Sequence, residues 1–213
     1  MIGVDEAGRG PVIGPLIMCG VSATPEMEKE LIKIGVKDSK KLSPKQRVEM
    51  AAQIRALPLT FKIVSVSHTE IDLYMGRGTS LNTIEAIATA QIIDAIKDDV
   101  IMLDCPSSNP SSYVSDIRRR IGNKEVQISA EYKADENYPI VSAASILAKV
   151  ERDSIIEKMR EEVGIDFGSG YPSDPKTKAF VKHYFDKYDV FRTQWETYKH
   201  AKTIAAQQTL GDF

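Results

Sequence analysis

Acidic residues stand where strongly hydrophobic segments of this sequence end. Asp5 and Glu6 close the first such segment, 1–5, directly before a glycine-rich turn. Asp104 closes a second apolar run just before a proline, and Asp135 precedes a predicted helix. Side chains at strand ends project into solvent-accessible crevices, so these four carboxylates could converge above one sheet.

Four carboxylates held close together repel one another unless they are protonated or bridged by cations. Oxygen ligands without histidine or cysteine suit Mg²⁺ or Mn²⁺. Two such ions about 3.5–4 Å apart would activate a water molecule and stabilise the leaving oxygen of a phosphodiester. The alternative is that these acids cap helices or stay solvated, since the chain has 30 Asp and Glu and four strand-end positions could coincide.

The segment 8–15, GRGPVIGP, places a flexible main chain beside the first two acids. Because position 13 is Ile13, Gly8 and Gly10 do not complete the GxGxxG pattern of dinucleotide-binding proteins, and no P-loop Lys-Ser/Thr pair follows. What remains is a backbone that a ligand can approach closely, with Arg9 supplying positive charge. This combination suits a sugar–phosphate strand.

A basic cluster follows at 38–47, DSKKLSPKQR. Lys40 and Lys41, with Lys45 and Arg47 further on, form a candidate phosphate-binding track. Clusters of this kind are also typical of a solvated surface, so the charges alone do not establish binding.

Local patterns indicate the elements that must position these residues. Five segments are predicted strands: 1–5, 15–24, 61–67, 100–105 and 125–132. Capping signals and helical periodicity predict helices from Pro44 towards Leu57, from Ser80 to before Asp98, and from Pro139 to Gly164. Strands alternating with longer helices predict an α/β fold with a five-stranded mixed sheet flanked by helices.

The loop 164–175, GIDFGSGYPSDP, is rich in Gly, Ser and Pro and precedes a helical segment that begins after Asp174. We expect a sheet domain at 1–165, a C-terminal helical extension at 166–205 and a tail at 206–213. The aromatic residues of the extension predict a helix pair that packs back on the sheet: Phe180, Tyr184, Phe185, Tyr188, Phe191 and Trp195.

Composition excludes several classes of protein. The 28 Lys and Arg nearly balance the 30 Asp and Glu, so the net charge of −2 excludes a histone-like polycation but not a local basic patch. The two cysteines, Cys19 and Cys105, form no CxxC pair, and the histidines are scattered, which supports neither zinc ligation nor a disulfide scaffold. Neither a membrane span nor a secretory signal is recognisable, and we expect a cytoplasmic protein.

Six motifs together resemble one known family: DEAGRG at 5–10, DSKKL at 38–42, the strand-end Asp104, KAD at 133–135, SAASILAKVERD at 142–153 and GSGYPSDP at 168–175. They resemble ribonuclease HII, the type 2 ribonuclease H family, in an archaeal form. Related type 3 enzymes are expected to differ in the glycine-turn motif and to carry an additional N-terminal domain, which we do not expect here.

The resemblance implies a ribonuclease H-like fold, with 1–165 as the catalytic domain and 166–205 as a substrate-binding extension. It implies endonucleolytic cleavage of RNA in RNA–DNA hybrids and at ribonucleotides embedded in duplex DNA, which leaves 5′-phosphate and 3′-hydroxyl ends. Such cleavage would serve primer removal and ribonucleotide removal in DNA replication and repair. We expect a monomer.

The resemblance also implies roles for individual residues. Its four metal-binding and catalytic carboxylates correspond to Asp5, Glu6, Asp104 and Asp135. The family's turn that recognises the ribose 2′-hydroxyl and the flanking phosphates corresponds to Gly8, Arg9 and Gly10. Tyr171 corresponds to the tyrosine that stacks near the sugar of the following deoxynucleotide and forms a hydrogen bond at the RNA–DNA junction. The alternative is a loop ring packed for shape.

The end of the chain, QQTLGDF, resembles the PIP box that binds the sliding clamp, proliferating cell nuclear antigen (PCNA). Gln207, Leu210 and Phe213 recur every three residues, so one turn of 3₁₀ helix would place them on one face. The usual pattern has two adjacent aromatic residues and this sequence has one, which bears on affinity. The alternative is a frayed terminus.

Two other functions compete with a metal-dependent endoribonuclease. A catalytically silent hybrid-binding module recruited by the clamp would not need the acids, which are intact. A Mg²⁺-dependent phosphatase would place an aspartyl nucleophile in a DxD context, and the first strand has none.

Overall fold

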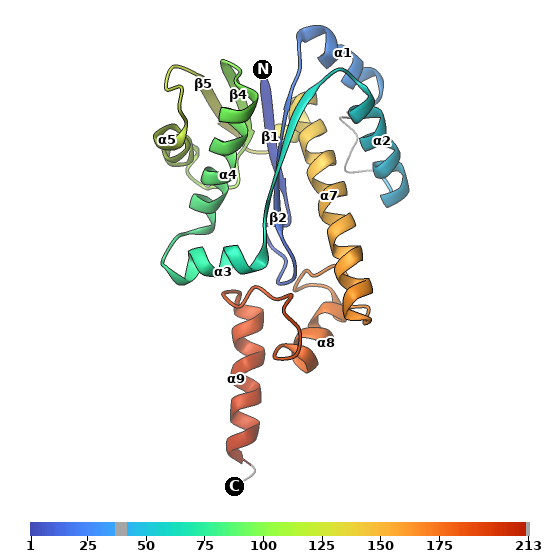
Figure 1. Cartoon of the computed structure of the whole chain (residues 1–213), viewed down its shortest axis with the longest axis vertical. Helices are drawn as coiled ribbons and strands as arrows, with labels where there is room; N and C mark the ends of the chain where they lie inside the picture. Colours follow the sequence, from blue (N-terminus) through green and yellow to red (C-terminus); the bar gives the residue numbers. More distant parts are fainter. Residues whose placement is uncertain (37–41, 212–213) are drawn as a thin grey trace. The chain divides into compact units, whose positions relative to one another are not determined.

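The computed structural model describes residues 1–36 and 42–211, with the backbone alone for 208–211. All five predicted strands are present and form one sheet of order β3–β2–β1–β4–β5: β1 (Ile2–Ala7), β2 (Leu16–Ser22), β3 (Thr60–Val66), β4 (Val100–Asp104) and β5 (Gln127–Glu131) (Figure 1). β1 pairs antiparallel with β2 and parallel with β4, and β4 pairs parallel with β5. The predicted five-stranded mixed sheet flanked by helices is therefore confirmed.

The helices expected from sequence are also present: α2 (Pro44–Ala56), α4 (Leu81–Ile96), α7 (Pro139–Val163), α8 (Pro175–Tyr184) and α9 (Glu196–Gly211). Ser43 forms the predicted capping box of α2, because its hydroxyl accepts a hydrogen bond from the Gln46 N–H while the Gln46 side chain accepts one from the Ser43 N–H. α7 ends before Gly164, whose φ of +70° is readily adopted by glycine.

Four shorter helices were not anticipated: α1 (Pro25–Lys33), α3 (His68–Gly76), α5 (Pro110–Arg120) and α6 (Ala134–Asn137). Three of them carry a start signal that the sequence displays. Thr24 and Asn109 are N-caps, each followed by a proline in the first turn, and Ser67 forms a capping box with Glu70. None of the helices among the described residues is long and apolar enough to span a bilayer.

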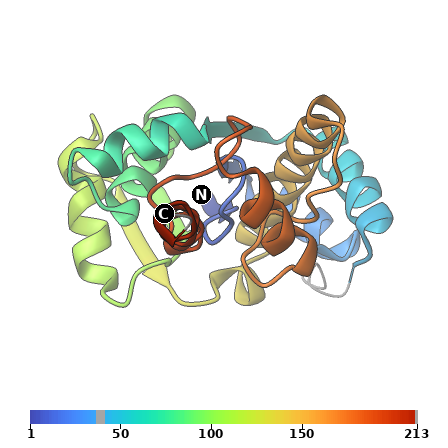
Figure 2. The ribbon, with the colours of Figure 1, turned by 90° about the horizontal axis from the view of Figure 1, so that it is seen from below.

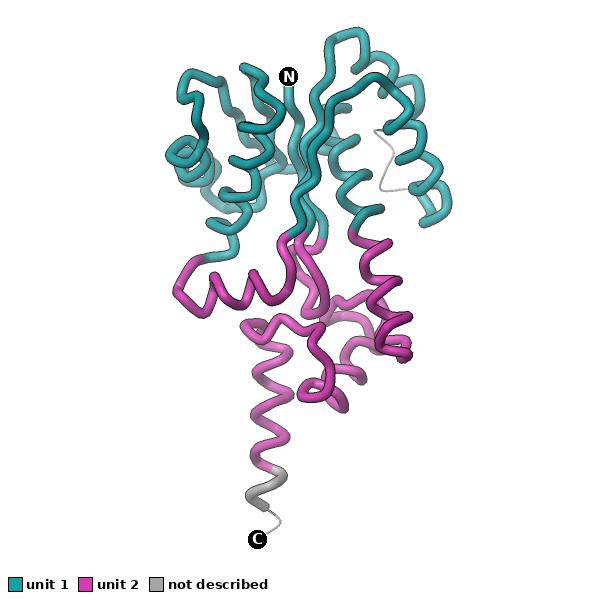
Figure 3. Tube along the Cα trace, viewed as in Figure 1, with its two compact units in different colours: residues 1–7, 17–65, 80–151 teal, residues 8–16, 66–79, 152–213 magenta. Residues whose placement is uncertain are grey.

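Packing divides the chain into two compact units (Figure 3). Unit 1 comprises Met1–Ala7, Ile17–Ser65 and Ser80–Glu151, and unit 2 comprises Gly8–Leu16, Val66–Thr79 and Arg152–Phe213. Unit 1 holds the sheet. Unit 2 joins the C-terminal segment to the turn that follows β1 and to α3, so it is assembled from three separate stretches of chain.

Two glycines of unit 1 let helices approach the two faces of the sheet. A Cβ on Gly3 would lie 2.6 Å from the Val141 backbone nitrogen in α7, and a Cβ on Gly20 would lie 2.2 Å from the Ile92 side chain in α4. Any larger residue would push the helix away. Figures 1 and 2 accordingly show α4 and α5 on one face of the sheet and the first half of α7 on the other.

The aromatic residues of the C-terminal segment form the core of unit 2. The ring of Phe180 lies 5.4 Å from those of Phe167 and Phe191 and 5.6 Å from that of Tyr188, measured between centroids. Val12 and Ile13, from the turn after β1, complete this core. Residues of unit 2 itself therefore supply apolar partners for these rings.

Candidate active site

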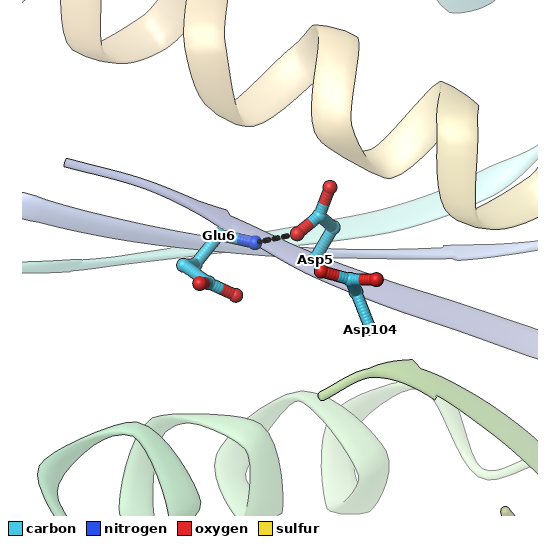
Figure 4. A group of neighbouring side chains, drawn as sticks. All are labelled: Asp5, Glu6 and Asp104. Carbon is cyan, nitrogen blue, oxygen red and sulfur yellow. Dashed lines mark hydrogen bonds between the residues drawn. The ribbon is translucent and has the colours of Figure 1, made fainter. Parts of the chain in front are cut away.

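Three of the predicted acids lie together in unit 1 (Figure 4). Asp5 and Glu6 are neighbours in β1, so their side chains leave opposite faces of the sheet, and Asp104 ends the adjacent parallel strand β4. Each of the three offers a carboxylate oxygen, and these oxygens all lie within 4.8 Å of one another. The convergence expected for these acids is thus present in the structure.

The fourth predicted acid, Asp135, lies in the KAD motif after β5 and is not part of this group of three. Lys133 has a φ of +56°, a left-handed conformation, which turns the chain so that the Ala134 N–H donates a hydrogen bond of 2.7 Å to Asp104 Oδ1. Asp135 follows inside the short helix α6 and is 7% exposed. It acts on Asp5 electrostatically, since its charge contributes to the raised pKa of that residue.

Burial and the nearby charge of Asp104 raise the pKa of Asp5 from 3.8 to about 7. Hydrogen bonds from Ser145 and from the Glu6 N–H, the latter 2.7 Å long, oppose this rise, and the charge of Asp135 adds to it. Without a cation, one carboxyl therefore holds its proton near neutral pH to limit the repulsion. A cluster of hard oxygen donors with this excess of negative charge fits a divalent cation such as Mg²⁺ or Mn²⁺.

Four of the residues predicted to contact nucleic acid lie in unit 2: Gly8, Arg9, Gly10 and Tyr171. The turn of Gly8, Arg9 and Gly10 leads to Val12, whose N–H donates a 2.8 Å hydrogen bond to the carbonyl of Gly170. This bond joins the turn to the loop that carries Tyr171. A Cβ on Gly10 would lie 3.7 Å from the Tyr171 ring, so the structure brings these predicted residues side by side.

Arg152, in α7, contacts the loop that carries Tyr171. Its side chain is 1% exposed, and its guanidinium lies 5.2 Å from the centre of the Tyr171 ring. The same group donates hydrogen bonds to the carbonyls of Ile13 and Ser169. The cation therefore orients the ring and ties the loop to the glycine turn.

The other predicted site residues belong to the basic cluster and to the C-terminal tail. Lys40 and Lys41 lie outside the described residues, as does Phe213. Gln207 is exposed near the end of α9, and the backbone at Leu210 belongs to the same helix. The segment is thus α-helical up to Gly211 rather than a 3₁₀ turn.

The family model for ribonuclease HII matches residues 2–198. The chain belongs to the ribonuclease HII family. It is 43% identical to ribonuclease HII of Pyrococcus furiosus over 221 residues, covering 99% of this chain and 96% of that protein. It is 38% identical to ribonuclease HII of Methanosarcina barkeri over 211 residues, covering 94% of each chain. Membership makes the protein a ribonuclease H, an endonucleolytic hydrolase.

Solved structures support the ribonuclease HII assignment. The ribonuclease H2 of Pyrococcus horikoshii superposes with a TM-score of 0.87 at 40% identity, covering 95% of this chain and 97% of that one. The ribonuclease HII of Archaeoglobus fulgidus, solved as a complex with PCNA, gives a TM-score of 0.85 at 39% identity and covers 94% of this chain and 96% of that one. The ribonuclease H-like fold expected from the motifs is confirmed.

Ribonuclease HII motifs also contain site residues to which the sequence analysis gave no role. Ser145 and Arg152 both belong to SAASILAKVERD, and their spacing of seven residues places them on one side of α7. Ser145 contacts Asp5, whereas Arg152 contacts the loop at Tyr171. The pattern of small and apolar residues identified a buried helix, but it did not indicate which polar groups the helix would meet.

The raised pKa of Asp5 predicts an unusual pH dependence of stability in metal-free buffer. Folded Asp5 keeps its proton up to about pH 7, whereas unfolded Asp5 loses it near 3.8. The folded state therefore binds more protons in this interval, and the Asp5 contribution lowers the free energy of unfolding as the pH rises from about 4 to about 7. Asp5→Asn should remove this loss and be more stable than wild type at pH 8, by on the order of 2 kcal/mol.

Urea denaturation in EDTA at pH 4 and pH 8 checks this expectation, with the exposed Asp99→Asn as the matched control. The gain at pH 8 should be absent in Asp99→Asn and much smaller at pH 4. Equal pH dependence in wild type and Asp5→Asn would contradict the electrostatic account of the site.

Proposed function

We propose that this protein hydrolyses the RNA strand of RNA–DNA hybrids and cuts at ribonucleotides embedded in duplex DNA, leaving 5′-phosphate and 3′-hydroxyl ends. The observation that carries the proposal is the group of Asp5, Glu6 and Asp104, whose oxygens lie within 4.8 Å of one another in a member of the ribonuclease HII family. Apolar residues would pack better at these positions than clustered acids, so packing does not account for the group.

In this proposal Asp5, Glu6, Asp104 and Asp135 hold the metal. Two Mg²⁺ or Mn²⁺ ions there would activate the attacking water and stabilise the leaving 3′ oxygen. A bound cation would lower the pKa of Asp5, because it would stabilise the charged carboxylate against the burial and the repulsion that raise this pKa. Ser145 and the Ala134 N–H orient the carboxylates of Asp5 and Asp104 through their hydrogen bonds.

The glycine turn and Tyr171 supply recognition in the same proposal. Only Ala7 separates Glu6 from the turn, so the chain holds the main-chain donors of the turn close in sequence to two of the proposed metal ligands. The turn would read the 2′-hydroxyl, which distinguishes RNA from DNA, and Arg9 would contact phosphate. Tyr171 would stack on the sugar of the following deoxynucleotide.

The decisive experiment uses a labelled DNA duplex that contains one ribonucleotide, an all-DNA duplex of the same sequence, and an RNA–DNA hybrid. With Mg²⁺ or Mn²⁺ we expect cleavage of the first and third duplexes and none of the second, and EDTA should stop all cleavage. Cleavage of the all-DNA duplex, or cleavage unaffected by EDTA, would refute the proposal.

Tyr171→Ala is expected to impair cleavage at a lone ribonucleotide more than it impairs nonspecific duplex binding. Stacking on a ring contributes about 1–3 kcal/mol, so cleavage should fall by about 10-fold or more, whereas contacts to phosphates remain. Steady-state cleavage and fluorescence anisotropy measure the two effects. Tyr171→Phe keeps the ring beside Arg152 and loses only the hydroxyl, so it should cleave faster than Tyr171→Ala. Equal cleavage by Tyr171→Ala and wild type would exclude the stacking role.

We also propose that the C-terminal segment binds a sliding clamp and brings the enzyme to sites of replication and repair. Support comes from Gln207, Leu210 and Phe213 at PIP-box spacing, and from the Archaeoglobus fulgidus ribonuclease HII, which was solved with PCNA. The two apolar residues would fill a pocket on the clamp while Gln207 adds polar specificity.

The double variant Leu210→Ala, Phe213→Ala should lose clamp binding and keep hydrolysis of free oligonucleotides, because neither residue is among the proposed metal ligands. Calorimetry with the cognate clamp should show at least a 10-fold weaker affinity, about 1.4 kcal/mol, since two buried apolar side chains are removed. Lys202→Ala, an exposed change on α9, serves as the control. Unchanged clamp affinity in the double variant would dismiss the PIP box.

A further inference from the structure

The glycine turn is bound from one side by a buried arginine of the C-terminal segment. Arg192 is 0% exposed and donates hydrogen bonds to the carbonyl oxygens of Gly8 at 2.7 Å, Arg9 at 3.1 Å and Gly14 at 2.8 Å. Its own N–H donates to the Val12 carbonyl at 2.8 Å. One side chain therefore orients peptide groups along most of the turn.

Trp195 continues this pattern at the next carbonyl. Its indole Nε1 donates a 3.1 Å hydrogen bond to the Gly10 carbonyl, and the Arg192 guanidinium lies 4.8 Å from the centre of the Trp195 ring. The carbonyls of three consecutive residues, 8–10, are thus all hydrogen-bonded to Arg192 or Trp195. The stacked cation and ring hold each other in place.

This arrangement determines where the N–H groups of the turn point. In a planar trans peptide the C=O of one residue and the N–H of the next point in opposite directions. Because the carbonyls of Gly8 and Arg9 point to Arg192, the N–H groups of Arg9 and Gly10 point away from it. Gly10 is exposed, and two successive N–H donors form a concavity suited to an anion or a hydroxyl oxygen.

We propose that Arg192 and Trp195 are positioning residues that aim the N–H groups of Arg9 and Gly10 at the ribose 2′-hydroxyl. The inference rests on the proposed reading of the ribonucleotide by this turn. In this proposal both side chains act on the substrate through the turn. The buried positive charge of Arg192 also polarises the peptides whose oxygens it binds, which strengthens their N–H groups as donors.

The test measures discrimination rather than activity. The ratio of the Kd for an all-DNA duplex to the Kd for the same duplex with one ribonucleotide is obtained by fluorescence anisotropy in EDTA, where metal-dependent cleavage is prevented. Arg192→Lys keeps the charge but loses the planar fork of donors, and should lower this ratio about 10-fold. Trp195→Phe removes one hydrogen bond and keeps a ring, and should lower it about threefold.

Val181→Ala, which removes packing from the core of unit 2 but none of the hydrogen bonds to the turn, is the matched control. If Arg192 and Trp195 had only a structural role, their variants would bind both duplexes more weakly by the same factor, as the control should. A ratio of the two Kd values that stays at the wild-type value in Trp195→Phe and in folded Arg192→Lys would overturn the inference. If Arg192→Lys does not fold, Trp195→Phe alone decides. If the wild-type protein binds both duplexes equally, the turn does not recognise the ribonucleotide, and the proposed function of the turn fails. If the wild-type ratio is above one but the variants keep it, only the role of Arg192 and Trp195 fails.

Discussion

Asp104→Asn is expected to lower cleavage of a single-ribonucleotide duplex by at least about 1000-fold at saturating Mg²⁺, because a metal site contributes several kcal/mol of charge stabilisation to the transition state. Asparagine has nearly the volume of aspartate, and its amide oxygen can still accept the Ala134 N–H bond. The fold should therefore survive while one anionic ligand is lost. Initial rates and circular dichroism measure the two consequences.

Asp99→Asn gives the comparison, since Asp99 directly precedes the same strand at its opposite end and is exposed. It should cleave at the wild-type rate. Asp5→Asn should behave like Asp104→Asn. If Asp104→Asn turns over substrate like wild type at limiting metal, the carboxylate group in unit 1 is not the active site.

Gly8→Ala is expected to have the second-largest effect, on both stability and cleavage. Gly8 has a φ of +90°, and a Cβ there would lie 2.5 Å from the Arg152 side chain and 2.6 Å from the Pro15 carbonyl oxygen. Backbone strain and overpacking together should lower the free energy of unfolding by about 2–4 kcal/mol. A turn displaced by about 1 Å should also slow cleavage by about 100-fold.

Gly78→Ala separates the two causes, because Gly78 has a similar φ of +85° but no atom within 4 Å of its added Cβ. It should lose about 1 kcal/mol and retain full cleavage. Thermal denaturation and initial rates should thus distinguish the variants. Equal losses of stability and of cleavage rate in the two variants would mean that the close packing around Gly8 does not cause the effect of Gly8→Ala.

Most elements of this protein could be predicted because their signals are local. Ser43 and Gln46 cap α2 within one turn of chain, and the apolar runs of β1 and β4 end at their acids. α1, α3 and α5 were missed although Thr24, Ser67 and Asn109 mark their starts, because helices of 9 to 11 residues show only two or three turns of a repeating pattern.

The acids of the candidate site could be named from motifs, since Asp5, Glu6, Asp104 and Asp135 stand at the ends of predictable elements. The approach of the Asp5, Glu6 and Asp104 carboxylate oxygens to within 4.8 Å of one another could not be deduced in advance. It depends on the pairing of β1 with β4 and on the left-handed backbone conformation of Lys133. The surrounding tertiary structure, and not the residue type, holds a lysine in that conformation. The rise in the Asp5 pKa follows only from that approach and from burial.

The sequence by itself determined the family, the α/β class and the residues with chemical potential, because each depends on residue types at short spacing. Only the tertiary structure assigned Arg192 to the glycine turn, 184 residues away from Gly8, and placed the aromatic residues in one core with Val12 and Ile13. A hydrogen bond across such a separation has no local signature, since the partner is chosen by how the chain packs. A buried arginine and a glycine turn acquire a common role only when the fold brings them into contact.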